Sequence, residues 1–206
     1  MRGRWALIAT GVVVFVLVAS QILIPRLGEA RVEDRLTAGG GTAEVTIGAV
    51  PALRLLFSDG ERFEVRAHDL ALDPNDLDQG VFDRLDGFGI VDIAIDDSSA
   101  GPFELSSFTL TREGEGPYRL TAHGNASPTA LADYGFERVQ LPAEGLLDAL
   151  LNPFLDQADV AVPVNLDMQV VSEDGRIRVV DGGGTLAGFS MGPLAEFLTS
   201  AVVVQL

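Results

Sequence analysis

The chain has 206 residues, of which 47% are hydrophobic and 21% charged, and its formal net charge is −16 at pH 7. This length suits one principal folded domain, and the charge argues against nucleic acid as a partner, because phosphate backbones are bound by clustered cations. The chain contains no cysteine, which excludes disulfides, thiolate metal sites and a cysteine nucleophile.

An apolar run without any charged residue extends from Trp5 to Ile24. A helix of this length rises about 30 Å, the thickness of the hydrocarbon core of a bilayer. The run therefore predicts a transmembrane anchor or a signal segment over residues 1–25, and the sequence leaves open whether it is cleaved. In both cases we expect export: a single-pass protein of the cell membrane whose folded domain lies outside the cytoplasm.

The residues that follow the run, 26–41, carry charges at helical spacing and end in Gly39-Gly40-Gly41. Glycine accommodates the left-handed backbone that commonly ends a helix. We expect these residues to form a helical stalk that joins the membrane segment to a domain over residues 42–206.

Within the domain, apolar and polar residues alternate in several short segments, which is typical of strands with one buried face. A few leucine-rich segments with helical spacing lie between them. Together they predict an α+β fold, an antiparallel sheet with short amphipathic helices on its inner face. The expected strands are 43–48, 61–72, 90–96, 103–112, 118–123, 158–171, 176–180 and 201–206, and the expected helices follow Pro51 and cover 76–85, 128–136, 142–151 and 193–200.

Two motifs resemble functional sites but match them poorly. Residues 188–192 read G-x-S-x-G, which would make Ser190 the nucleophile of an esterase, but no histidine follows it as that fold requires. Residues 73–84 begin like a calcium loop, yet glycine stands at the eighth position and Arg84 at the twelfth. We therefore expect a protein that is not an enzyme, with no catalytic residue, no metal and no cofactor.

The leucine-rich helices after Pro51 and over 142–151 allow two interpretations. Apolar helix faces usually pack into the core. The alternative is that these two helices leave an apolar groove on the concave face of the sheet, where an acyl chain binds. The groove would be lined by Val50, Leu53, Leu56, Phe57, Leu147, Leu150, Leu151 and Phe154, with Arg54 or Arg62 at its mouth near the lipid head group.

Residues 45–70 read VTIGAVPALRLLFSDGERFEVRAHDL: a strand, a glycine, a proline-led apolar turn and a second strand. This stretch resembles the signature of the LmeA-like phospholipid-binding family of actinobacterial cell envelopes, and the order of elements along the chain is similar to that of the family. The resemblance implies a curved antiparallel sheet around a helix with an apolar cavity, as in tubular lipid-binding domains. It also implies a non-catalytic envelope protein that binds phospholipids, including those of the phosphatidylinositol type, and supports the assembly of envelope glycolipids.

We accordingly expect a membrane-anchored protein that holds phospholipid acyl chains in an apolar groove. The alternative is an anchored extracytoplasmic interaction or scaffold domain with a filled core and a protein partner that the sequence does not identify. A serine esterase that uses Ser190 is the third hypothesis.

Overall fold

The computed structural model describes residues 2–72, 81–127, 161–173, 176–186 and 189–190, and in the first helix it describes side chains from Val18 onward. The helical elements are α1 (Arg2–Leu36), η1 (Thr37–Gly39), η2 (Ala52–Phe57) and α2 (Val81–Asp86). The strands are β1 (Thr42–Gly48), β2 (Gly60–His68), β3 (Ala71–Leu72), β4 (Phe88–Ala100), β5 (Phe103–Glu113), β6 (Tyr118–Ala126), β7 (Val162–Glu173), β8 (Arg176–Leu186) and β9 (Phe189–Ser190).

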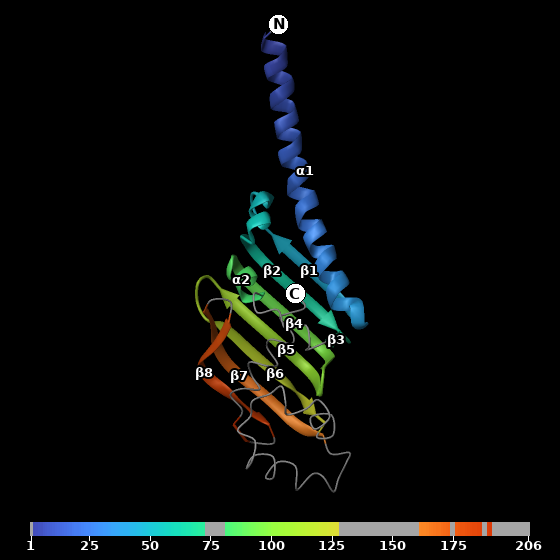
Figure 1. Cartoon of the computed structure of the whole chain (residues 1–206), viewed down its shortest axis with the longest axis vertical. Coiled ribbons are helices and arrows are strands. Elements are labelled where there is room, and N and C mark those ends of the chain that lie inside the picture. The colour runs from blue at the N-terminus through green and yellow to red at the C-terminus, as the bar shows by residue number, and fades with distance from the viewer. Residues whose placement is uncertain (1, 73–80, 128–160, 174–175, 187–188, 191–206) are drawn as a thin grey trace.

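The described strands form one open, curved sheet in the order β1-β2-β4-β5-β6-β7-β8-β9, with β3 paired to β4 outside this path (Figure 1). The fold is α+β and mostly antiparallel, which confirms the predicted class. One part of that prediction is wrong, because β2 and β3 both run parallel to β4. The chain between β2 and β4 passes through α2, and a crossover connection of this kind lets neighbouring strands run in the same direction.

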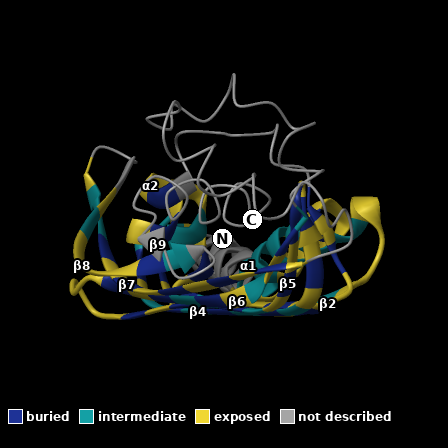
Figure 2. Ribbon diagram, turned by 90° about the horizontal axis from the view of Figure 1, so that it is seen from below, coloured by how far each residue is buried: buried dark blue, intermediate teal, exposed yellow. Residues whose placement is uncertain are grey.

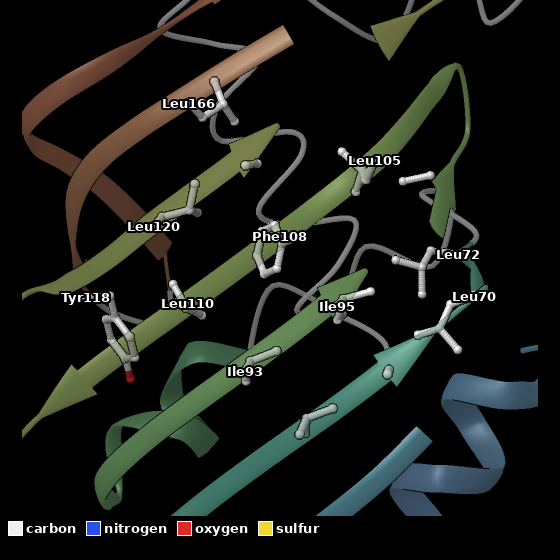
Figure 3. Close-up of a cluster of buried hydrophobic side chains, with 14 of the residues drawn as sticks. Leu70, Leu72, Ile93, Ile95, Leu105, Phe108, Leu110, Tyr118, Leu120 and Leu166 are labelled. Carbon is white, nitrogen blue, oxygen red and sulfur yellow. The ribbon is translucent and has the colours of Figure 1, made fainter. Parts of the chain in front are cut away.

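The two faces of the sheet differ in polarity, as the alternation along each strand requires. On the outer face lie polar residues, including the ion pairs Arg66–Asp92 and Arg119–Asp167. The inner face is apolar and buried, and α2 lies on this side of the curved sheet (Figure 2). The largest fully buried side chains, many of them shown in Figure 3, are Leu36, Leu70, Ile93, Ile95, Phe103, Leu105, Phe108, Leu110, Tyr118, Leu120, Leu166 and Met168.

Most predicted strands within the described residues are present with small changes at their ends. The expected hairpin is formed by β5 and β6, whose partners include Leu110 and Leu120. Strand β8 is longer than the expected strand 176–180, because residues 182–184 also belong to it and pair with β7. Gly182 has a φ of 79° and lies where a Cβ would meet the carbonyl oxygen of Asp167 at 2.3 Å, so this position of the strand requires glycine. The elements expected at 128–151 and 193–206 lie outside the described residues.

Helix α1 is continuous through Pro25, so the predicted membrane segment and the predicted stalk belong to one helix. Its second half lies along β1 and reaches the core through Leu36, which has no exposed surface. In the part of the chain whose side chains are described, no helix is long and apolar enough to cross a membrane.

Candidate functional site

The segment between β1 and β2 forms the short helix η2 beside α1, at the end of the two strands that lies toward the N-terminus (Figure 1). Pro51 precedes η2 in an extended conformation, and Ser58 ends it in the left-handed region at φ 54°. The guanidinium of Arg54 donates two hydrogen bonds to the carboxylate of Asp59, from Nη2 at 2.6 Å and from Nε at 2.9 Å. The hydrogen bond from Arg54 lowers the pKa of Asp59, so this ion pair is charged on both sides at neutral pH.

Four large apolar side chains on or next to η2 point away from the core. Their exposed fractions are 67% for Val50, 40% for Leu53, 66% for Leu56 and 83% for Phe57. We call these four residues the apolar tip. Single exposed apolar residues are ordinary, whereas a group of four in one short segment makes this surface the candidate site for an apolar contact.

Helix η2 also packs inward, which connects the apolar tip to the interior of the domain. Ala52 has no exposed surface, and Leu55 is partly buried against the main hydrophobic core. Leu55 thus contacts the core, while its neighbour in the chain, Leu56, lies at the surface.

The neighbouring part of α1 adds to this apolar surface. Val18, Ile22, Leu23 and Leu27 are each more than half exposed. The side chain of Gln21 connects the two elements, because its Oε1 accepts a hydrogen bond from the backbone N–H of Ala52 at 3.1 Å.

A polar hollow of about 550 Å³ lies near the same end of the sheet and reaches from Arg54 and Asp59 to β5 and β7. At its base the guanidinium of Arg112, only 7% exposed, donates to the carboxylate of Asp86 and to the carbonyl oxygens of Leu85, Asp86 and Phe88. These bonds attach the end of α2 to the sheet.

Tyr118 completes this polar network. Its hydroxyl donates to Asp86 at 2.8 Å, and the guanidinium carbon of Arg112 lies 4.5 Å from its ring centroid. The pKa of Tyr118 is raised, mainly by burial and to a lesser extent by the hydrogen bond to Asp86, so its phenol stays neutral. Arg112 is buried and paired with Asp86, so it stabilises the fold and is a poor site for an anion. The pair of Arg54 with Asp59 remains partly exposed, 41% and 46%.

The structure brings together only part of the predicted groove. Val50, Leu53, Leu56 and Phe57 lie together at the surface, with Arg54 beside them in its ion pair with Asp59. Arg62 lies on the polar outer face of β2 and pairs with Glu64. Leu147, Leu150, Leu151 and Phe154 lie outside the described residues.

The esterase hypothesis needs Ser190 near a histidine, and the order of the described strands separates them. Ser190 belongs to β9, whereas His123 lies on β6 with β7 and β8 between them. His68 lies farther away on β2, where its Nε2 is 3.7 Å from Asp96. Among the described side chains, no three His, Asp or Glu residues gather closely enough to hold a metal ion.

Sequence reasoning missed the contacts that position the site. The pairing of Arg112 with Asp86 spans 26 residues, and no local pattern indicates it. Gln21 did carry a signal, because it is the one amide side chain in the uncharged run 5–24 and a buried amide usually has a hydrogen-bonding partner. Comparison with protein-family models, curated proteins and solved structures finds no match to this chain.

Proposed function

We propose that this protein is a non-catalytic phospholipid-binding protein of the cell membrane, with a single N-terminal anchor and its folded domain outside the cytoplasm. The observation that carries the proposal is the apolar tip: four exposed apolar side chains beside Leu55, which packs against the core of a one-sided sheet. An acyl chain would enter the domain at this point.

The anchor is supported by the sequence of α1. The uncharged run from Trp5 to Ile24 lies entirely within this helix and has the length of a membrane span. The exposed side chains at its end, Val18, Ile22 and Leu23, are apolar, as contact with lipid requires.

Acyl-chain binding at the apolar tip is supported by the energy of apolar burial. Each buried methylene contributes about 0.8 kcal/mol, so a contact with ten of them holds a lipid against water. Arg54 is the cation beside the tip and the candidate for contact with the head group, whereas Arg62 belongs to the outer face. The resemblance to the LmeA-like family favours phosphatidylinositol-type lipids and a role in envelope glycolipid assembly.

The proposal is tested on the full chain, extracted from membranes in mild detergent and measured by native mass spectrometry. We expect one phospholipid to remain bound to the wild-type protein and to be lost from the Leu56→Asp variant. Leu56 is 66% exposed, so this change should leave folding intact, and circular dichroism checks that it does. Val180→Asp, at an exposed valine on β8, is the matched control and should keep the lipid.

The same experiment distinguishes the alternatives. If the wild-type protein carries no lipid but co-purifies with another protein, the lipid-binding proposal is wrong and the anchored interaction domain replaces it. Retention of lipid by the Leu56→Asp variant at the wild-type level would show that the retained lipid surrounds the anchor and does not contact the tip.

A further inference from the structure

Three hydrogen bonds place the segment from β1 to η2 at defined heights along α1. The backbone N–H of Val45 donates to Glu33, that of Ile47 to Glu29, and that of Ala52 to Gln21. As the chain proceeds from β1 to η2, its partners therefore move steadily toward the N-terminus of α1. Between Glu29 and Gln21 the helix rises about 12 Å.

The exposed surface of α1 changes character along the same direction. Between residues 26 and 35 most exposed side chains are charged, although Leu27 is exposed as well, whereas the exposed residues from 18 to 24 are all apolar: Val18, Ile22 and Leu23. The boundary falls at the end of the uncharged run, Ile24. Gln21 lies three residues inside this boundary, which corresponds to a depth of about 4.5 Å along the helix.

Helix η2 is thus held at the height of residues that the proposed function places in lipid. We propose that η2 is a second membrane contact, whose apolar tip is immersed in the outer leaflet beside α1. The inference rests on the anchor in the proposed function. Amphipathic helices that lie in a membrane interface bury their apolar face about 5–10 Å into the boundary between head groups and acyl chains, which is close to the depth that Gln21 gives.

The net charge of the chain agrees with an apolar contact between the tip and a lipid bilayer. The chain has a net charge of −16, so attraction to anionic head groups cannot hold the domain on a bilayer, and the contact must be apolar. The only charged side chain within η2, Arg54, is paired with Asp59, which lowers the cost of bringing it to the interface. The sheet end that begins at Gly60 and Phe88 then faces the bilayer, and the domain cannot swing freely about α1.

The test measures the depth of a tryptophan at the tip. The sequence contains a single tryptophan, Trp5, in the proposed anchor. The full chain carrying Trp5→Phe and Phe57→Trp is reconstituted into phosphatidylcholine vesicles whose acyl chains are brominated near the head group or near the terminal methyl. The matched control carries Trp5→Phe and Val180→Trp, at an exposed position on β8.

We expect fluorescence of the Phe57→Trp variant to shift to the blue in vesicles and to be quenched several-fold more than that of the Val180→Trp control, most strongly by the shallow bromines. Quenching no greater than the control would overturn the immersion of η2. If the Phe57→Trp change disturbs folding, Leu56→Trp replaces it, because Leu56 is also exposed and adjacent.

The wild-type chain separates this inference from the proposed function. Quenching of Trp5 reports insertion of the anchor, independently of the tip. If Trp5 is quenched in the wild-type chain but the tryptophan of the Phe57→Trp variant is not, the anchor is supported and the membrane contact of η2 is contradicted. An unquenched Trp5 would contradict the membrane anchor of the proposed function. The other part of the proposed function, retention of a bound phospholipid, is measured separately by native mass spectrometry.

Discussion

The backbone N–H of Ile47 donates a hydrogen bond to the carboxylate of Glu29 at 2.9 Å, across the edge of the sheet. One turn farther along α1, Glu33 accepts from Val45 at 3.1 Å. Four helical residues rise about 6 Å and two strand residues about 6.7 Å, so carboxylates on successive turns match alternate amides of β1. Helix α1 thereby closes the edge at β1, which would otherwise be open to pairing with another strand.

Replacing Glu29 by alanine should lower the free energy of unfolding by about 1–2 kcal/mol, because the amide of Ile47 loses its acceptor in a partly buried position. Hydrogen exchange at the amide of Ile47 should become faster, while the amides of β1 that point toward β2 and pair with it stay protected. Glu29→Gln keeps an oxygen acceptor and should lose less, and Glu44→Ala, an exposed carboxylate on β1, is the control. Unchanged exchange at Ile47 in the Glu29→Ala protein would contradict the closing role of α1.

Replacing Arg112 by methionine should destabilise the fold by about 3 kcal/mol, because it leaves the carboxylate of Asp86 without its cationic partner and removes the guanidinium donor from three carbonyl oxygens. Urea unfolding followed by circular dichroism measures the change. Arg119→Met is the matched control: its pair with Asp167 is two-thirds exposed on both sides, and such surface pairs contribute about 0–1 kcal/mol. Similar losses in the two variants would mean that the buried pair of Arg112 with Asp86 does not stabilise α2 on the sheet.

The raised pKa of Tyr118 predicts a loss of stability of the folded protein at alkaline pH. Burial raises its pKa above the ordinary value of 10.0, so above that pH the unfolded chain releases a proton that the folded chain keeps. Stability should fall as the pH rises above 10, by about 1.4 kcal/mol per pH unit from this one group. The Tyr118→Phe variant, measured by urea unfolding over the same range, should lack this contribution. Identical slopes in the two proteins would show that Tyr118 titrates normally.

The parts of the fold that the sequence predicts well are those that depend on local alternation. In β7 every second residue from Val162 to Val170 is buried, as the pattern predicts. The parallel pairing of β2 with β4 and the extension of β8 through its glycines depend on distant partners, which no local pattern specifies. The same limit applies to the site: leucine and phenylalanine in η2 predict an apolar helix, but the sequence alone does not distinguish Leu55, against the core, from Leu56, at the surface.

Gly87 holds η2 in place from the other side, so its replacement should disturb the apolar tip. A Cβ on Gly87 would lie 1.7 Å from the carbonyl oxygen of Ser58, the residue that ends η2. Backbone atoms cannot yield as a flexible side chain can, and overpacking of this kind costs about 1–3 kcal/mol. The carbonyl of Gly87 also accepts from the N–H of Gly60 at 3.0 Å, which ties the start of β2 to the same turn.

Gly87→Ala should therefore lower the unfolding midpoint in urea and, in a protein that still folds, weaken retention of phospholipid, because η2 is displaced from the core. Gly183→Ala is the matched control, since a Cβ there would meet no atom within 4 Å. Lipid retention that stays at the wild-type level in a destabilised Gly87→Ala protein would mean that the position of η2 is not what binds the acyl chains.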